Sequence, residues 1–167
     1  MSYTKNSIRK MSALAVADFK GTKKLMKGLR QSKPQKLDKL FHELHVGEFH
    51  KIDCLDCANC CKTISPSVHD SDVRRMAAFL KMKESEFIEK YLDADTDDDF
   101  VFNTTPCPFL EDDNRCTIYP SRPKACREYP HTNRKRMYQI LDLTAKNTKV
   151  CPAVFNIIEK LKRSKLA

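Results

Sequence analysis

The stretch DCLDCANCCK, residues 53–62, contains four of the eight cysteines in the chain, spaced as C-x-x-C-x-x-C-C. Each C-x-x-C spacing allows one turn of backbone to direct two sulfur atoms toward a common point, which is typical of metal–thiolate sites. The competing use is disulfide bonding to distant cysteines, and the redox compartment decides between the two.

The N-terminal segment favours a reducing compartment. Its apolar run, ALAVA at residues 13–17, is short and ends at Asp18. A secretory signal needs an apolar core of roughly 7–15 residues, and a membrane span needs roughly 20. Neither is found, so the sequence predicts a cytoplasmic protein without a membrane segment. Cytoplasmic thiols stay reduced, and dense cysteines then favour metal binding over disulfides.

The excess of positive charge is concentrated near the N-terminus. The 167-residue chain has 31 Lys and Arg against 22 Asp and Glu, and residues 1–52 hold 12 of the former and 4 of the latter. We expect a basic helical N-terminal extension over residues 1–50 and a cysteine-cluster metal-binding domain over residues 51–167. The extension could bind nucleic acid or an acidic protein, or it could be a solvated helical face.

Hydrophobic spacing predicts mainly helical structure. The predicted helices span residues 6–30, 34–49, 70–82, 83–95 and 151–165, with Leu37, Leu40, Phe41 and Leu44 on the buried face of the second, and Val73, Met76, Ala77 and Leu80 on that of the third. The third helix is expected to be capped by Asp70 or Ser71. The fold class is mainly α with a small β-hairpin, as a compact cysteine-rich domain.

The remaining segments are predicted to be short and irregular. A hairpin is expected from CPFL (107–110) to CTIY (116–119), a β-prone stretch in FVFNT (100–104) and a helical turn in RPKACREYP (122–130). RMYQILDL (136–143) is predicted to be a strand or extended loop. DTDDDF (95–100) is predicted to be a polar turn, and residues 53–62 a loop.

Five motifs in order, CLDCANCC, CPFL, CTIY, RPKACREYP and a late CP, resemble the YkgJ-like cysteine-cluster (CxxCxxCC) family of zinc- or iron-chelating domains. The resemblance covers about residues 52–155 and places every cysteine within a family motif. It implies metal chelation and supplies no reaction. The candidate metal ligands are Cys54, Cys57, Cys60, Cys61, Cys107, Cys116, Cys126 and Cys151.

Two ligand arrangements remain open. In the first, which is slightly favoured, Cys54, Cys57 and Cys60 bind a [4Fe-4S] iron–sulfur cluster, and the remote ligand is Cys107 or Cys151, each followed by Pro. In the second, the eight thiolates form two tetrahedral Cys₄ zinc sites. Side chains of neighbouring residues tend to diverge, so Cys60 and Cys61 are expected to serve different metal positions.

The cysteine chemistry leads to two functional hypotheses. An iron–sulfur protein would have an electron-transfer, sensing or accessory role, whereas a structural zinc module would present a basic surface to an RNA or protein partner. No catalytic constellation is evident, so the chain is not expected to be an enzyme by itself. The basic residues around Cys126, namely Arg122, Lys124 and Arg127, are expected to offset the negative charge of the thiolates.

Overall fold

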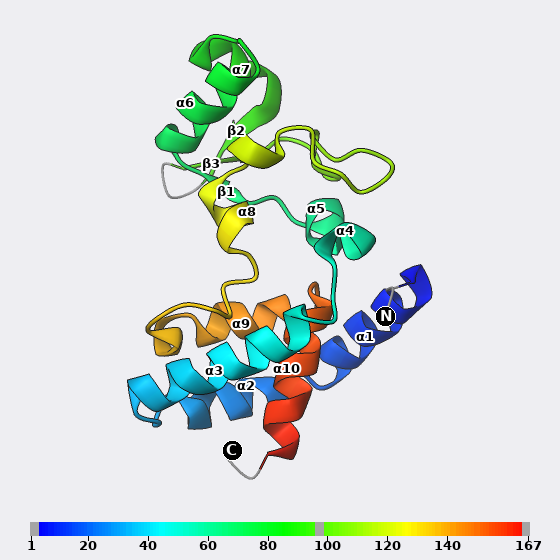
Figure 1. The fold of residues 1–167 in the computed structure, drawn as a ribbon, viewed down its shortest axis with the longest axis vertical. Helices are drawn as coiled ribbons and strands as arrows, with labels where there is room; N and C mark the ends of the chain where they lie inside the picture. Colours follow the sequence, from blue (N-terminus) through cyan, green and yellow to red (C-terminus); the bar gives the residue numbers. More distant parts are fainter. Residues whose placement is uncertain (1–3, 96–98, 165–167) are drawn as a thin grey trace. The chain divides into compact units, whose positions relative to one another are not determined.

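The computed structural model describes residues 4–95 and 99–164. The chain divides into two units, shown in Figure 1: a helical unit, formed by Met1–Cys57 and Pro130–Ala167, and a sheet unit, formed by Ala58–Tyr129. Each unit has its own cluster of buried hydrophobic side chains. The cysteine-rich stretch, residues 53–62, is therefore divided between the two units after Cys57.

The helical unit is built from α1 (Lys5–Ala17), α2 (Phe19–Leu29), α3 (Pro34–Phe49), α4 (Cys54–Cys57), η2 (Met137–Gln139), α9 (Leu141–Asn147) and α10 (Pro152–Arg163). Proline occupies the first position of α3 and α10, where a missing N–H costs no helical hydrogen bond. The single helix predicted over residues 6–30 is wrong. Asp18 leaves the helical conformation (φ −103°, ψ 27°) and separates α1 from α2.

The core of the helical unit is formed by side chains from both the N-terminal and the C-terminal parts of the chain. The predicted face of α3 is confirmed, with Leu37 and Phe41 buried and Leu40 and Leu44 packed against the cluster. The other buried members are Leu25, Met26, Leu29, Met137, Leu141, Ala145, Val154, Ile157, Ile158 and Leu161. The domain boundary at residue 50 stays a prediction, and helices from both sides of it share this core.

Polar side chains of α3 fix the segment that follows Pro130. Both carboxylate oxygens of Asp38 accept backbone N–H bonds at 2.8 Å, from Arg136 and Met137. Nδ1 of His45 lies 2.8 Å from Oγ1 of the buried Thr132. Residues 136–143, predicted to be a strand or extended loop, are instead largely helical, within η2 and α9. The prediction failed because the segment is short and its conformation depends on contacts with α3.

The sheet unit contains α5 (Asn59–Thr63), β1 (Ser67–Val68), α6 (Asp70–Phe79), α7 (Glu84–Tyr91), β2 (Leu92–Ala94), β3 (Phe100–Phe102), η1 (Tyr119–Ser121) and α8 (Lys124–Glu128). The strands form an antiparallel sheet in the order β1-β3-β2, with Val68 opposite Phe100 and Leu92 opposite Phe102. Mainly helical structure with a small β element is confirmed, as are the β-prone stretch at residues 100–104 and the helical turn in α8.

The sheet-unit core gathers α6, α7 and the strands. Val73, Met76 and Ala77 are buried as predicted, and Leu80 packs against the cluster. The helix cap is His69 rather than Asp70 or Ser71. The predicted hairpin is reduced to one bridge between Leu110 and Cys116.

The predicted polar turn at residues 95–100 falls partly on residues 96–98, which lie outside the described residues. Helices long and apolar enough to cross a bilayer are absent from the described part of the chain.

Candidate metal centre

The eight cysteines are divided between the two units. Cys54, Cys57 and Cys151 belong to the helical unit, and the other five, Cys60, Cys61, Cys107, Cys116 and Cys126, belong to the sheet unit. All eight lie among the described residues, and none is joined in a disulfide. Thiols are the precursors of metal-binding thiolates, so the chemistry of the donors fits a soft metal such as zinc or iron.

The stretch around the first four cysteines is more regular than predicted. Cys54 to Cys57 form the single turn α4, and the side chain of Asp53 accepts a 2.8 Å hydrogen bond from the backbone N–H of Leu55. Ala58 has a left-handed conformation (φ 44°) and precedes α5. The predicted loop is therefore two short helices separated by Ala58, and the turn of α4 carries both cysteines of the first C-x-x-C pair.

Cys54, Cys57 and Cys151 form the group that we name the helical-unit cysteines. Cys151 caps α10 and packs against the hydrophobic core. Burial raises the pKa of Cys151 to about 12, the backbone amides of Val154 and Ala153 oppose this by hydrogen bonding, and the negative charges of Cys54 and Cys57 raise it further. Negative charge on Cys54 and Cys57 therefore disfavours ionisation of the Cys151 thiol.

Cys61, Cys107, Cys116 and Cys126 form a second group, the sheet-unit cysteines. The backbone N–H of Cys107 donates to the carbonyl of Cys61 at 2.8 Å. Cys116 is held opposite Leu110 by the bridge, and the N–H of Leu110 donates to the carbonyl of Cys107 at 3.1 Å. Backbone pairing thus brings together three cysteines that are far apart in the sequence.

Cys126 is assigned to the sheet-unit cysteines because its pKa responds to the charges of the other three. The pKa of Cys126 is raised to about 12, first by burial and then by the negative charges of Cys61, Cys107 and Cys116. Burial also raises the pKa of Cys107, to about 11, and that of Cys116. Ionising all four thiols without a cation is therefore unfavourable, whereas a bound metal ion would supply the compensating charge.

The Cys60–Cys61 doublet does not diverge as expected. The two Sγ atoms lie 3.9 Å apart, within hydrogen-bonding distance for sulfur, and this bond lowers the pKa of Cys61 to about 7. Two thiolates at about 2.3 Å from one tetrahedral zinc ion would be separated by about 3.8 Å. The observed distance is thus compatible with both sulfurs meeting one metal ion, and the prediction of different metal positions stays untested.

Of the basic residues near Cys126, Arg122 behaves as expected. The positive charge of its guanidinium partly offsets the burial-driven rise in the pKa values of Cys116 and Cys126. The guanidinium also lies 3.7 Å from the centre of the Tyr119 ring and donates a 2.6 Å hydrogen bond to the Tyr119 carbonyl. Lys124 instead faces Glu128, with 3.7 Å between Nζ and Oε1.

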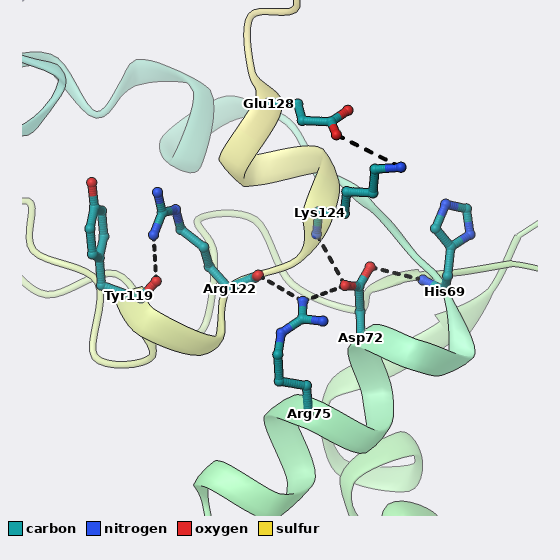
Figure 2. A network of polar contacts seen from close by, with 7 residues as sticks. All are labelled: His69, Asp72, Arg75, Tyr119, Arg122, Lys124 and Glu128. Atoms are coloured by element: carbon teal, nitrogen blue, oxygen red, sulfur yellow. Dashed lines mark hydrogen bonds and ion pairs between the residues drawn. The ribbon is translucent and has the colours of Figure 1, made fainter.

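A buried polar network beside Cys126 was not predicted from the sequence. Figure 2 shows Asp72 and Arg75 of α6 contacting the backbone on either side of Pro123. Asp72 lies next to the apolar stripe of α6, a position at which the sequence pattern does not predict whether a side chain is buried or exposed. The i, i+3 spacing of an acid and a base was the available signal, but such pairs are common on exposed helix faces.

The cysteine groups are defined by backbone pairing and shared electrostatics. Across residues 4–95 and 99–164, no three His, Cys, Asp or Glu side chains stand close enough together to hold a metal ion as they are placed. The donor chemistry and the convergence of the segments fit a thiolate-bound metal, while a closed coordination shell is not part of the described structure.

Comparison with known proteins assigns the family. Neither the curated proteins nor the solved structures contain a match to the chain. A family model named CxxCxxCC, with the description "Putative zinc- or iron-chelating domain", matches residues 53–152, a range that contains all eight cysteines. Because this match spans more than half of the sequence, the chain belongs to the CxxCxxCC family of zinc- or iron-chelating domains.

Proposed function

We propose that the chain binds zinc or iron through its cysteine thiolates and that the helical-unit and sheet-unit cysteines form separate centres. The observation that carries this proposal is the convergence of Cys61, Cys107, Cys116 and Cys126 from four segments of the sheet unit. A hydrophobic core has no need of four neighbouring cysteines whose thiolates would repel one another. A metal centre does need them, because the bound cation is coordinated by the thiolates and compensates their charge.

The two groups favour different occupants. Four thiolates in the sheet unit match a tetrahedral Cys₄ zinc site, with Cys60 as a neighbouring fifth thiol. The helical-unit cysteines combine a C-x-x-C pair with a Cys-Pro sequence at Cys151, which together provide three of the four thiolates of a [4Fe-4S] ligand pattern. Because Cys151 belongs to the same unit as Cys54 and Cys57, it is favoured over Cys107 as the remote cluster ligand that is followed by proline. Three thiolates also suit zinc with an open fourth position.

The identity of the metal determines the role. A bound iron–sulfur cluster would supply one-electron chemistry, which supports an electron-transfer, sensing or accessory function. Zinc does not change oxidation state and would instead stabilise the fold. The proposed location is the cytoplasm, because a reducing compartment keeps all eight cysteines as thiols.

The full-length chain purified without oxygen is expected to contain zinc, iron or both, because soft thiolates bind these metals strongly. Elemental analysis measures the content, and absorption near roughly 400 nm distinguishes an iron–sulfur cluster from zinc. A well-folded preparation that contains neither metal, and acquires neither on addition of Zn²⁺ or Fe²⁺ with sulfide, would overturn the proposal.

A second proposed function, presentation of a basic surface, is supported by the arrangement of α2 and α9. We define the basic face as the exposed lysines of these two packed helices, Lys20, Lys23, Lys24, Lys27 and Lys146. Next to it, the ammonium groups of Lys149 and Lys23 lie 3.6 and 5.2 Å from the centre of the Phe19 ring. This concentration of positive charge suits RNA or an acidic protein surface.

Replacing Lys23 and Lys27 by Gln is expected to weaken RNA binding and to reduce the slope of log affinity against log salt by about 1.4, because each lysine–phosphate contact on a single strand contributes about 0.7 to that slope through counterion release. Fluorescence anisotropy with a single-stranded RNA at several salt concentrations measures both quantities. The matched control replaces Lys83 and Lys90, two exposed lysines of the sheet unit. Equal losses in the two double variants would show that the basic face has no special role.

A further inference from the structure

We propose that Asp72 and Arg75 of α6 are positioning residues for the sheet-unit metal centre, because they fix the backbone turn that carries Arg122 and Cys126. This inference rests on the proposed metal binding. It adds residues outside the cysteine motifs that act through the backbone rather than as ligands.

Asp72 is the centre of this network. Its side chain is buried, with 1 % of the residue exposed. Oδ1 accepts hydrogen bonds from the Arg75 guanidinium and, at 3.1 Å, from the backbone N–H of Lys124. Oδ2 accepts a longer bond of 3.4 Å from the backbone N–H of His69, which closes the first turn of α6. The carboxylate therefore ties the start of α6 to the start of α8, as seen in Figure 2.

Arg75 completes the connection on the other side of Pro123. Its Nη2 donates to Asp72 and also, at 3.0 Å, to the backbone carbonyl of Arg122. Proline has no backbone N–H, so the turn cannot be held by a donor of its own at this position. The buried pair instead contacts the carbonyl before Pro123 and the amide after it.

Both functional side chains of this turn depend on that backbone. Cys126 lies two residues after Lys124 in the five-residue helix α8. Arg122 extends from the same turn across the Tyr119 ring and acts on the thiols of Cys116 and Cys126. A shift of residues 122–124 would therefore displace a proposed ligand and its compensating cation together. Residues that orient metal ligands typically change metal affinity 10–100-fold when replaced.

The test is a Co²⁺ titration of the full-length chain in which Cys54 and Cys57 are replaced by Ser, so that the signal reports the sheet-unit cysteines. In this parent, Asp72→Asn is expected to weaken Co²⁺ binding about 10–100-fold. Thiolate-to-cobalt charge-transfer absorption per bound ion should fall by about one quarter if one of four thiolates is lost. The matched control is Asp99→Asn, since Asp99 bonds His69 at 2.6 Å and Ser67 at 3.0 Å instead of the turn.

The outcomes separate this inference from the function on which it rests. Equal affinity and equal charge-transfer absorption in Asp72→Asn, Asp99→Asn and the parent would overturn the positioning role and leave metal binding intact. A parent that binds no Co²⁺ would overturn both the positioning role and the proposed sheet-unit centre. If circular dichroism shows that Asp72→Asn does not fold, Arg75→Gln takes its place, because its side chain is partly exposed. Weakened binding in a folded Arg75→Gln variant supports the inference, and unchanged binding overturns it.

Discussion

Deletion of residues 1–33 is expected to unfold the helical unit while the sheet unit keeps its own core. The deletion removes α1 and α2, and with them the buried side chains of Leu25, Met26 and Leu29. Phe41 and the apolar face of α10 would then be exposed to water. The core of the sheet unit contains only residues between Val68 and Ile118, so it does not lose a buried side chain.

The expected size of this effect follows from buried volume. Truncation of a buried Leu or Met to Ala typically costs about 2–5 kcal/mol, and the deletion removes three such side chains entirely. The sum is comparable with the whole stability of a typical domain, about 5–15 kcal/mol. Amide hydrogen exchange should therefore lose protection throughout α3, α9 and α10, whereas α6 and α7 should retain it. Preserved protection in α10 would contradict this account of the core.

Two matched leucines provide a milder form of the same test. Leu29→Ala should lower the free energy of unfolding of the helical unit by about 2–5 kcal/mol, because Leu29 is 2 % exposed. Leu14→Ala, at a residue that is 50 % exposed, should change it by less than about 0.5 kcal/mol. Urea denaturation followed by circular dichroism measures both changes. A change of less than about 0.5 kcal/mol in Leu29→Ala would show that α2 does not belong to the core.

The long amphipathic helices were predictable because their local signals agree. In α3 and α10, a proline at the first helical position precedes apolar residues at helical spacing, and both helices were found where expected. The strands β1 and β2 were not predicted. They contain two and three residues, and strands this short are stabilised by pairing with β3 rather than by their own sequence.

The residue types of the candidate site were also predictable, but their grouping was not. The spacing of Cys54 and Cys57 indicates a shared site on its own, whereas the electrostatic effect of these two cysteines on Cys151 arises only in the folded helical unit, where α10 packs against α3. Asp72 shows the same limit. A sequence identifies an acid on a helix, but only the fold shows that its carboxylate is buried against the Pro123 turn.

Replacing cysteines in one group is expected to remove the metal of that group alone. Cys116→Ser with Cys126→Ser leaves two of the four sheet-unit thiols, too few for a Cys₄ site. Cys54→Ser with Cys151→Ser leaves only Cys57 in the helical unit. Serine nearly preserves the size of each side chain but is a poor ligand for zinc and iron, so each double variant tests coordination more than packing.

The most direct measurement is therefore the zinc and iron content per chain of the wild type and these two double variants, purified without oxygen and dialysed against a weak chelator. Two separate centres predict that each variant keeps part of the wild-type metal, and that the parts lost by the two variants add up to the wild-type content. Loss of all metal in both variants would contradict separate centres, and wild-type metal content in both would contradict cysteine ligation altogether.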